Sequence, residues 1–200
     1  MTARAALAAV LGILSGSAAG AQERPPLIPT RDALVEYQVR GPADRPPMSV
    51  QVHLSGGRIR AEPASLPGYL IVDRAADRAV VVMSQQHVFL EIPVETGLAR
   101  DYLFNTRMTY VRRGDARIAG QPCTEWDVKA PEGRTAHACI TTDGLVLRGE
   151  GNDPRYGSGR IEALSVTYAP QPDRLFRPPA GYQRLAVPMV PGSADNSSPR

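Results

Sequence analysis

Hydrophobic and polar residues alternate along much of the chain, and a period of two is typical of half-buried β-strands. An apolar residue stands at every second position of residues 33–40, ALVEYQVR, and of residues 48–54, MSVQVHL. In a strand, these side chains share one face. Ser55-Gly56-Gly57 then turns the chain into residues 58–62, which predicts a hairpin. The pattern indicates an antiparallel sheet with one apolar and one polar face.

Two short runs are apolar at every position. Residues 69–72, YLIV, and residues 79–83, AVVVM, flank the charged turn at residues 73–78. Runs of this length that are bounded by turns predict strands buried on both faces. Residues 87–92 continue the meander, and Pro93 ends it.

Residues 94–105, VETGLARDYLFN, are the one candidate helix. Leu98, Tyr102 and Leu103 recur at helical spacing, while Gly97 limits the helix to one or two turns. Strand character returns at residues 107–113. We therefore expect a mainly β protein in which a short helical insert is the main non-strand element.

Residues 119–149 contain both cysteines and the single tryptophan. Cys123 and Cys139 are equidistant from Pro131 in the turn signal Pro131-Glu132-Gly133, so a hairpin folded there brings the thiols together. A disulfide closing such a loop stabilises by about 3 kcal/mol. A redox or metal-binding pair is the alternative, although the spacing is not C-x-x-C. Alternation places Trp126, Val128, Ala136, Ala138 and Ile140 on one face of the hairpin, and Cys123, Glu125, Asp127 and His137 on the other.

An Asp143-Gly144 turn leads into a third strand at residues 145–147, which completes a meander. A glycine-rich break is expected next, at residues 149–159. A last strand follows at residues 160–168, and alternate side chains of this strand are expected to lie on one face. Residues 172–182 are expected to dock as a turn-rich segment. The side chains expected to share a face of the last strand are Leu164, Val166 and Tyr168.

The first 21 residues have the pattern of an export signal. Arg4 precedes an apolar run at residues 5–14, and Ala19-Gly20-Ala21 forms an A-x-A cleavage site. The apolar run is too short to span a bilayer, and no cysteine follows the site to carry a lipid. A buried or membrane-anchoring helix is the alternative. We expect a cleaved signal peptide at residues 1–21 and release into a periplasm as a protein that does not span the membrane.

Removing that segment leaves 22 basic and 20 acidic residues, because Arg4 is its one charged residue. Such a balance gives no reason to expect nucleic acid as a partner. The expected mature chain has an extended lead-in at residues 22–32, one β domain at residues 33–185 and a disordered tail at residues 186–200.

Three segments resemble exported proteins of the DUF4412 type, which are similar in turn to the LolA/LolB lipoprotein-localisation superfamily, including RseB-like sensors. They are residues 120–126, GQPCTEW, residues 138–148, ACITTDGLVLR, and residues 176–182, FRPPAGY. The resemblance implies a single strongly curved antiparallel sheet, an open half-barrel, with a helical lid over an apolar concave face that takes acyl chains.

Catalytic motifs are missing from the sequence: it has no glycine-rich phosphate loop, G-x-S-x-G, H-E-x-x-H or C-x-x-C. His53, His87 and His137 fall on separate predicted strands, so a metal site would require those strands to meet. Glu91 and Glu95 could form an acid/base pair. A simpler interpretation is that Glu91 lies at the end of a strand and Glu95 at the start of the candidate helix. We predict no catalytic residue, metal or cofactor.

The candidate function is therefore apolar. We predict a periplasmic, non-enzymatic, carrier-like protein that holds an acyl chain or lipid on the concave face, in a groove larger than roughly 300 Å³. The alternative is an envelope module that binds a protein through a sheet edge or face. The candidate ligand-binding residues are Met48, Val50, Val52, Met83, Met108, Tyr110, Trp126, Leu164, Val166 and Tyr168; the alternative is that these side chains simply fill the core.

Overall fold

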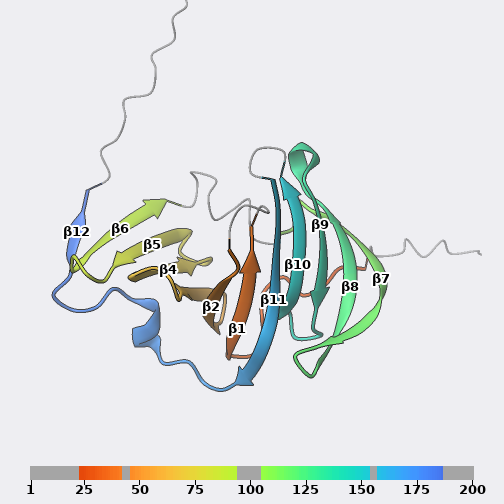
Figure 1. Cartoon of the computed structure of the whole chain (residues 1–200), viewed down its shortest axis with the longest axis horizontal. Coiled ribbons are helices and arrows are strands. Elements are labelled where there is room, and N and C mark those ends of the chain that lie inside the picture. The colour runs from red at the N-terminus through yellow and green to blue at the C-terminus, as the bar shows by residue number, and fades with distance from the viewer. Residues whose placement is uncertain (1–22, 42–45, 94–104, 154–156, 187–200) are drawn as a thin grey trace, which may run out of the picture.

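The structure, a computed structural model, describes residues 23–41, 46–93, 105–153 and 157–186. Across these residues, one sheet of twelve strands runs in the order β12-β6-β5-β4-β3-β2-β1-β11-β10-β9-β8-β7 and is not closed into a barrel (Figure 1). The protein is mainly β, as predicted. Its strands are β1 (Ala33–Arg40), β2 (Met48–Ser55), β3 (Arg58–Pro63), β4 (Gly68–Asp73), β5 (Arg78–Met83), β6 (Val88–Pro93), β7 (Thr109–Ile118), β8 (Gln121–Lys129), β9 (Thr135–Ile140), β10 (Val146–Asp153), β11 (Gly157–Tyr168) and β12 (Gln183–Leu185), with 3₁₀ turns η2 (Pro131–Gly133) and η3 (Asp173–Phe176).

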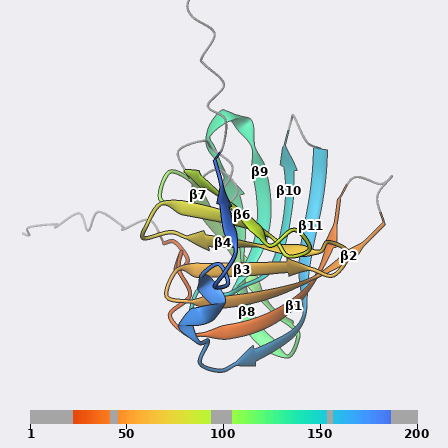
Figure 2. The same ribbon diagram turned by 90° about the vertical axis from the view of Figure 1, so that its left-hand side faces the viewer.

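One strand pair departs from the expected antiparallel sheet. β12 lies parallel to β6, with Gln183 opposite Val88, which makes the sheet mixed. The chain leaves β11 beside β1 and crosses β3 and β4 through η3 before it reaches β6 (Figure 2). This crossover allows a parallel approach, because parallel neighbours cannot be joined by a tight turn.

The crossing segment docks as expected from the sequence. Phe176 is buried against Ile71, Val80 and Val82. Ile71 and Val80 lie opposite each other and face this segment, whereas Val72 and Ala79, at the adjacent positions, belong to a separate cluster with Ile59 and Ile92 on the other face. This explains why residues 69–72 and 79–83 are apolar at consecutive positions.

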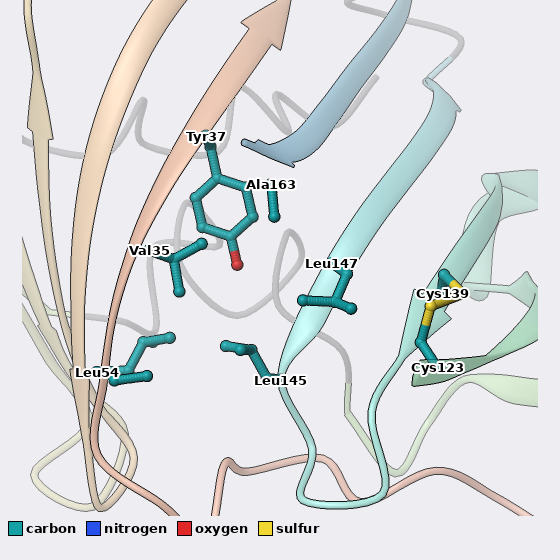
Figure 3. Close-up of a cluster of buried hydrophobic side chains, with 9 residues drawn as sticks. Val35, Tyr37, Leu54, Cys123, Cys139, Leu145, Leu147 and Ala163 are labelled. Atoms are coloured by element: carbon teal, nitrogen blue, oxygen red, sulfur yellow. A yellow bond between two sulfur atoms is a disulfide. The ribbon is translucent and has the colours of Figure 1, made fainter. Parts of the chain in front are cut away.

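The sheet has an apolar face in its middle. On β1, Val35 lies opposite Val52 of β2 and Val166 of β11, so the three share one side of the sheet. Tyr37 of the same side donates a hydrogen bond of 2.6 Å to the carbonyl oxygen of Val146. Side chains from β1 and β2 thus point toward those of β10 (Figure 3). The buried members of this core are Ala33, Val35, Tyr37, Leu54, Cys123, Cys139, Leu145, Leu147 and Ala163.

The predicted disulfide is confirmed. The sulfurs of Cys123 and Cys139 are bonded, and their Cα atoms lie 5.5 Å apart. The hairpin turns at η2 as predicted, and β8, β9 and β10 are neighbours in the sheet. Trp126 lies opposite Ala138, as the predicted alternation requires, and packs with Val128 and Ile140.

Two predictions for the last strands are wrong. The expected glycine-rich break at residues 149–159 is wrong for its described part, because residues 149–153 and 157–159 belong to β10 and β11 and stay paired through Gly151 and Gly159, while residues 154–156 lie outside the described residues. Both strands supply backbone hydrogen bonds there, and these do not depend on side chains. Leu164 does not share a face with Val166 and Tyr168: a β-bulge opposite Glu36 and Tyr37 inserts one extra residue, and Leu164 is 51% exposed. A bulge reverses the alternation locally.

The expected signal peptide at residues 1–21 lies outside the described residues. So do the candidate helix at residues 94–105, apart from Asn105, and the tail at residues 186–200, apart from Ala186. Within the residues that are described, none of the helical segments has the length and apolar character needed to cross a membrane.

Candidate functional site

The apolar face contains a cavity of about 270 Å³ between the strands around β1 and the start of β10. β1 and β2 contribute side chains from every second position, because successive side chains alternate between faces. The turn before β10 contributes the opposite wall. The cavity is lined by Leu27, Pro29, Tyr37, Val39, Val50, Val52, Leu54, Ile59, Arg74, Gly144, Leu145, Val146 and Ile161.

Residues 23–32, here called the strap, close part of this cavity. Leu27 and Pro29 are among its lining residues. Two hydrogen bonds hold the strap through its own backbone. Arg74 Nη1 donates to the Leu27 carbonyl at 2.7 Å, and the Thr30 amide donates to the Asp143 carbonyl at 2.9 Å. The segment expected to be a simple lead-in therefore supplies a cover for the site.

Gly144 allows the strap to approach closely. Its φ of +87° lies in the left-handed region, and a Cβ added there would lie 2.8 Å from the Ile28 carbonyl oxygen. Any larger residue would meet both backbone strain and a clash. The Asp143-Gly144 turn thus forms a close contact between the stapled meander and the strap.

Polar groups gather near Arg74, which is half-buried. The Tyr110 hydroxyl donates to the Asn105 carbonyl at 2.9 Å, and the Tyr110 ring lies 6.5 Å from the Trp126 ring in an edge-on arrangement. Burial raises the pKa of Tyr110, while the positive charges of Arg74 and Arg24 act in the opposite direction. Burial lowers the pKa of Arg74. Basic and aromatic groups therefore lie near one another beside the apolar cavity.

Burial also raises the pKa of Tyr37, whose hydroxyl reaches across to β10. The neutral phenol donates its proton to the Val146 carbonyl. Because this donor is already used inside the core, Tyr37 positions the cavity wall rather than offering a free polar group to a ligand.

The structure brings some of the predicted ligand-binding residues together and separates others. Val50 and Val52 line the cavity. Met108, Tyr110 and Trp126 lie in a neighbouring cluster that includes Leu27. Val166 and Tyr168 pack against the core around Val35, whereas Met48 and Met83 are partly buried in β2 and β5 away from the cavity lining. Leu164 faces solvent.

Sequence reasoning missed several lining residues. Tyr37 and Val39 continue the alternation that selected their neighbours in β2, so the pattern could have found them. Leu27 and Pro29 lie in a proline-rich stretch without periodicity, and Arg74 lies in a charged turn. No local pattern marks those three positions, because tertiary contacts bring them to the cavity.

A larger groove of about 570 Å³ lies along the ends of β8 to β11 and is lined mainly by polar residues. Several of its charged side chains form ion pairs. His137 Nδ1 lies 2.8 Å from Asp127 Oδ1, and Arg160 forms ion pairs with Glu150 and Glu162. Asp127 also lies opposite His137 in the register of β8 and β9, whereas Glu125 lies opposite Cys139 and pairs with Arg148. We favour the smaller, apolar cavity as the candidate site.

We predict that the Asp127 carboxylate titrates below its ordinary pKa, chiefly because of its hydrogen bond with His137 and also because of Arg113. A pKa depressed in the folded state favours folding above the unfolded-state pKa, and this contribution fades as the pH falls through the folded-state value. His137→Gln should raise the Asp127 midpoint, measured by carboxyl ¹³C NMR, and Arg113→Gln should do so to a smaller extent. A midpoint that neither substitution moves would contradict this pairing.

Each of the three histidines has different neighbours. His53 contacts Gln171 and Glu62, His87 stacks edge-on against Tyr182, and His137 pairs with Asp127. Among the described residues, no group of three or more histidine, cysteine, aspartate or glutamate side chains is arranged to hold a metal ion.

No protein-family model and no curated protein matches the sequence. Solved structures do match. An uncharacterised conserved protein from Thermus thermophilus has a TM-score of 0.54 at 10% identity, over 78% of this chain and 90% of that one. MucB in its complex with MucA, from Pseudomonas aeruginosa, has a TM-score of 0.46 at 13% identity, over 73% of this chain and 55% of that one. A LolA superfamily protein from Nitrosomonas europaea has a TM-score of 0.41 at 9% identity, over 77% of this chain and 92% of that one.

These matches concern the fold. A LolA superfamily protein is among the matching structures, whereas the DUF4412 resemblance is not confirmed. The chain spans about half the length of MucB. The fold and the site together define the class: a mainly β protein with one twelve-stranded sheet and an apolar cavity on that sheet.

Proposed function

We propose that this chain is an exported, non-enzymatic binding protein that holds a hydrophobic ligand in the cavity of the apolar face. The observation that carries the proposal is the cavity itself: its walls are almost entirely apolar, and its volume is about 270 Å³. This volume is slightly below the roughly 300 Å³ expected from the sequence and lies near the lower end for small-molecule sites.

The size of the cavity limits the ligand. At about 30 Å³ for each group of water size, 270 Å³ accommodates about nine methylene groups. Each buried methylene contributes about 0.8 kcal/mol, so nine contribute about 7 kcal/mol before the cost of association is subtracted. One acyl chain of moderate length therefore suits the cavity.

The proposal includes a curved, half-barrel form of the sheet, in which the strap and the segment at residues 94–105 would cover the ligand. Export to the periplasm is supported by the signal-like pattern at residues 1–21 and by the disulfide, which is typical of oxidising compartments. Expression of the full chain in a Gram-negative host, followed by fractionation and mass measurement, tests the export and the cleavage after Ala21.

Filling the cavity should weaken ligand binding. Val52 is partly buried and lines the cavity, so a Val52→Phe side chain would occupy its volume. We expect the affinity for the neutral fluorescent probe N-phenyl-1-naphthylamine to fall at least about tenfold, which corresponds to losing about two buried methylenes. Fluorescence titration measures the effect.

Leu164→Phe is the matched control, because it adds a similar ring at an exposed position of β11, on the other side of β1 from β2. It should leave probe binding unchanged. Equal binding by the wild-type protein and both variants would place the probe elsewhere and contradict the proposal.

The alternative role, a module that binds an envelope protein through a sheet edge, finds less support. β7 ends the described sheet, and Val111 on it is 46% exposed. However, Arg112, Arg113 and Arg117 also lie on β7, and its register shifts by a bulge between Arg112 and Gly114. Charged side chains and bulges oppose the addition of another strand.

A further inference from the structure

We propose that the strap is the gate of the cavity: its N-terminal part swings away to admit the ligand and then closes over it. This inference rests on the proposed function and adds the route by which the ligand enters. Leu27 and Pro29 of the strap line the cavity, so moving them opens its wall. Segments that open over a binding site belong to the parts of a structure that are least costly to displace.

The strap lies against the sheet without joining it. It is not one of the twelve strands that the described residues form. Its three prolines, at positions 25, 26 and 29, have no amide hydrogen and cannot donate to a strand ladder. Six of its ten residues are exposed. Opening the strap therefore breaks no strand pairing.

The C-terminal end of the strap is fixed. Asp32 Oδ2 accepts a hydrogen bond of 2.9 Å from the amide of Gln171, and the Arg31 guanidinium lies 3.7 Å from the centre of the Tyr168 ring. β1 begins at the next residue, Ala33. These contacts place the hinge of the strap just before Arg31.

The N-terminal end is held more weakly. Glu23 lies 3.8 Å from Arg112, and the two side chains are 70% and 42% exposed. An ion pair between exposed side chains contributes little, because water screens it. The proposed cleavage after Ala21 would also leave this end of the strap one residue from the end of the mature chain. The strap therefore opens from its N-terminal end.

The Asp143-Gly144 turn acts as the catch that keeps the strap closed. The Thr30 amide donates to the Asp143 carbonyl at 2.9 Å. Gly144 has a φ of +87°, and a Cβ added to it would lie 2.8 Å from the Ile28 carbonyl oxygen. A side chain at position 144 must therefore push the strap outward, while the hinge contacts at Arg31 and Asp32 remain.

The experiment uses Gly144→Ala in the full mature chain with its disulfide intact. Hydrogen exchange of the Thr30 amide reports the opening of the strap, and stopped-flow fluorescence gives the association rate of N-phenyl-1-naphthylamine. We expect both rates to rise by a similar factor, at least about fivefold, because each is proportional to the fraction of molecules with an open strap. The amide of Gln171, which lies beyond the hinge, should keep its protection.

Gly133→Ala is the matched control. Gly133 also has a positive φ, +75°, but a Cβ added to it meets no atom within 4 Å. It lies in η2, at the opposite end of β9 from the Asp143-Gly144 turn. The substitution adds the same kind of backbone strain without touching the strap. It should change neither rate.

A locked strap tests the gate in the other direction. A Cβ added to Gly57 would lie 3.6 Å from Ile28 Cγ2, so Ile28→Cys with Gly57→Cys can form a disulfide after a small shift. This bridge should slow probe association at least about tenfold, since entry then requires a movement that the bridge prevents. Mild reduction should restore the rate, because Cys123 and Cys139 are 5% and 0% exposed and keep their own bridge.

The outcomes separate the gate from the proposed function. An unchanged association rate in Gly144→Ala, despite faster exchange at Thr30, would show that the probe enters by another route and would overturn the inference alone. Unchanged exchange at Thr30, or undiminished association in the locked protein, would do the same. A wild-type protein that does not bind the probe would overturn both.

Discussion

Replacing Cys123 and Cys139 together by serine should lower the free energy of unfolding by about 3 kcal/mol without abolishing the fold. The bridge closes a short loop, with a sequence separation of 16, so its removal mainly adds freedom to the unfolded chain. Both side chains belong to the buried core around Val35 and Leu147, so two hydroxyls placed there add a desolvation cost.

Urea unfolding followed by circular dichroism measures this effect. Wild-type protein unfolded and refolded under reducing conditions is the control for the bridge without the added hydroxyls, and it should lose slightly less stability. Since the neighbouring strands β7 and β10 hold the hairpin in register, the far-ultraviolet spectrum should stay that of a β protein. A loss below about 1 kcal/mol would mean that the bridge contributes little to stability.

Phe176→Ala should destabilise the protein by about 3–5 kcal/mol, the usual range for removing a buried phenylalanine. The ring is 4% exposed, packs on Ile71, Val80 and Val82, and receives the Arg58 guanidinium 4.7 Å from its centre. Its loss would uncover these side chains and free the crossing segment that leads to β12. Thermal and urea unfolding give the magnitude.

Leu185→Ala is the matched control, since Leu185 lies on β12 and is 42% exposed. It should change stability by less than about 0.5 kcal/mol. Hydrogen exchange adds a second measure: in Phe176→Ala, the amide of Gln183, which bonds the His87 carbonyl at 2.9 Å, should lose protection. Full protection there would show that β12 docks independently of Phe176.

Much of the sheet could be predicted, because its determinants are local. Alternation in β1 and β2, the turn at Ser55-Gly56-Gly57 and the symmetric placement of the cysteines about Pro131 depend on neighbouring residues alone. Val50 and Val52 were found as cavity residues for the same reason.

The missed features depend on contacts between distant segments. The parallel pairing of β12 with β6 follows from the docking of Phe176, and the bulge beside Tyr37 redirects Leu164. Neither leaves a periodic mark in the sequence. The site shows the same limit: Leu27 and Arg74 are separated by 47 positions and meet at one hydrogen bond.

The two ends of the sheet have a consequence for behaviour at high concentration. One end is β12, three exposed residues long, and the other is β7 with its arginines and its bulge. Short, charged or distorted edges are poor templates for a neighbouring molecule. The protein is therefore expected to resist edge-to-edge aggregation, so that its sheet, although not closed into a barrel, need not polymerise in a crowded solution.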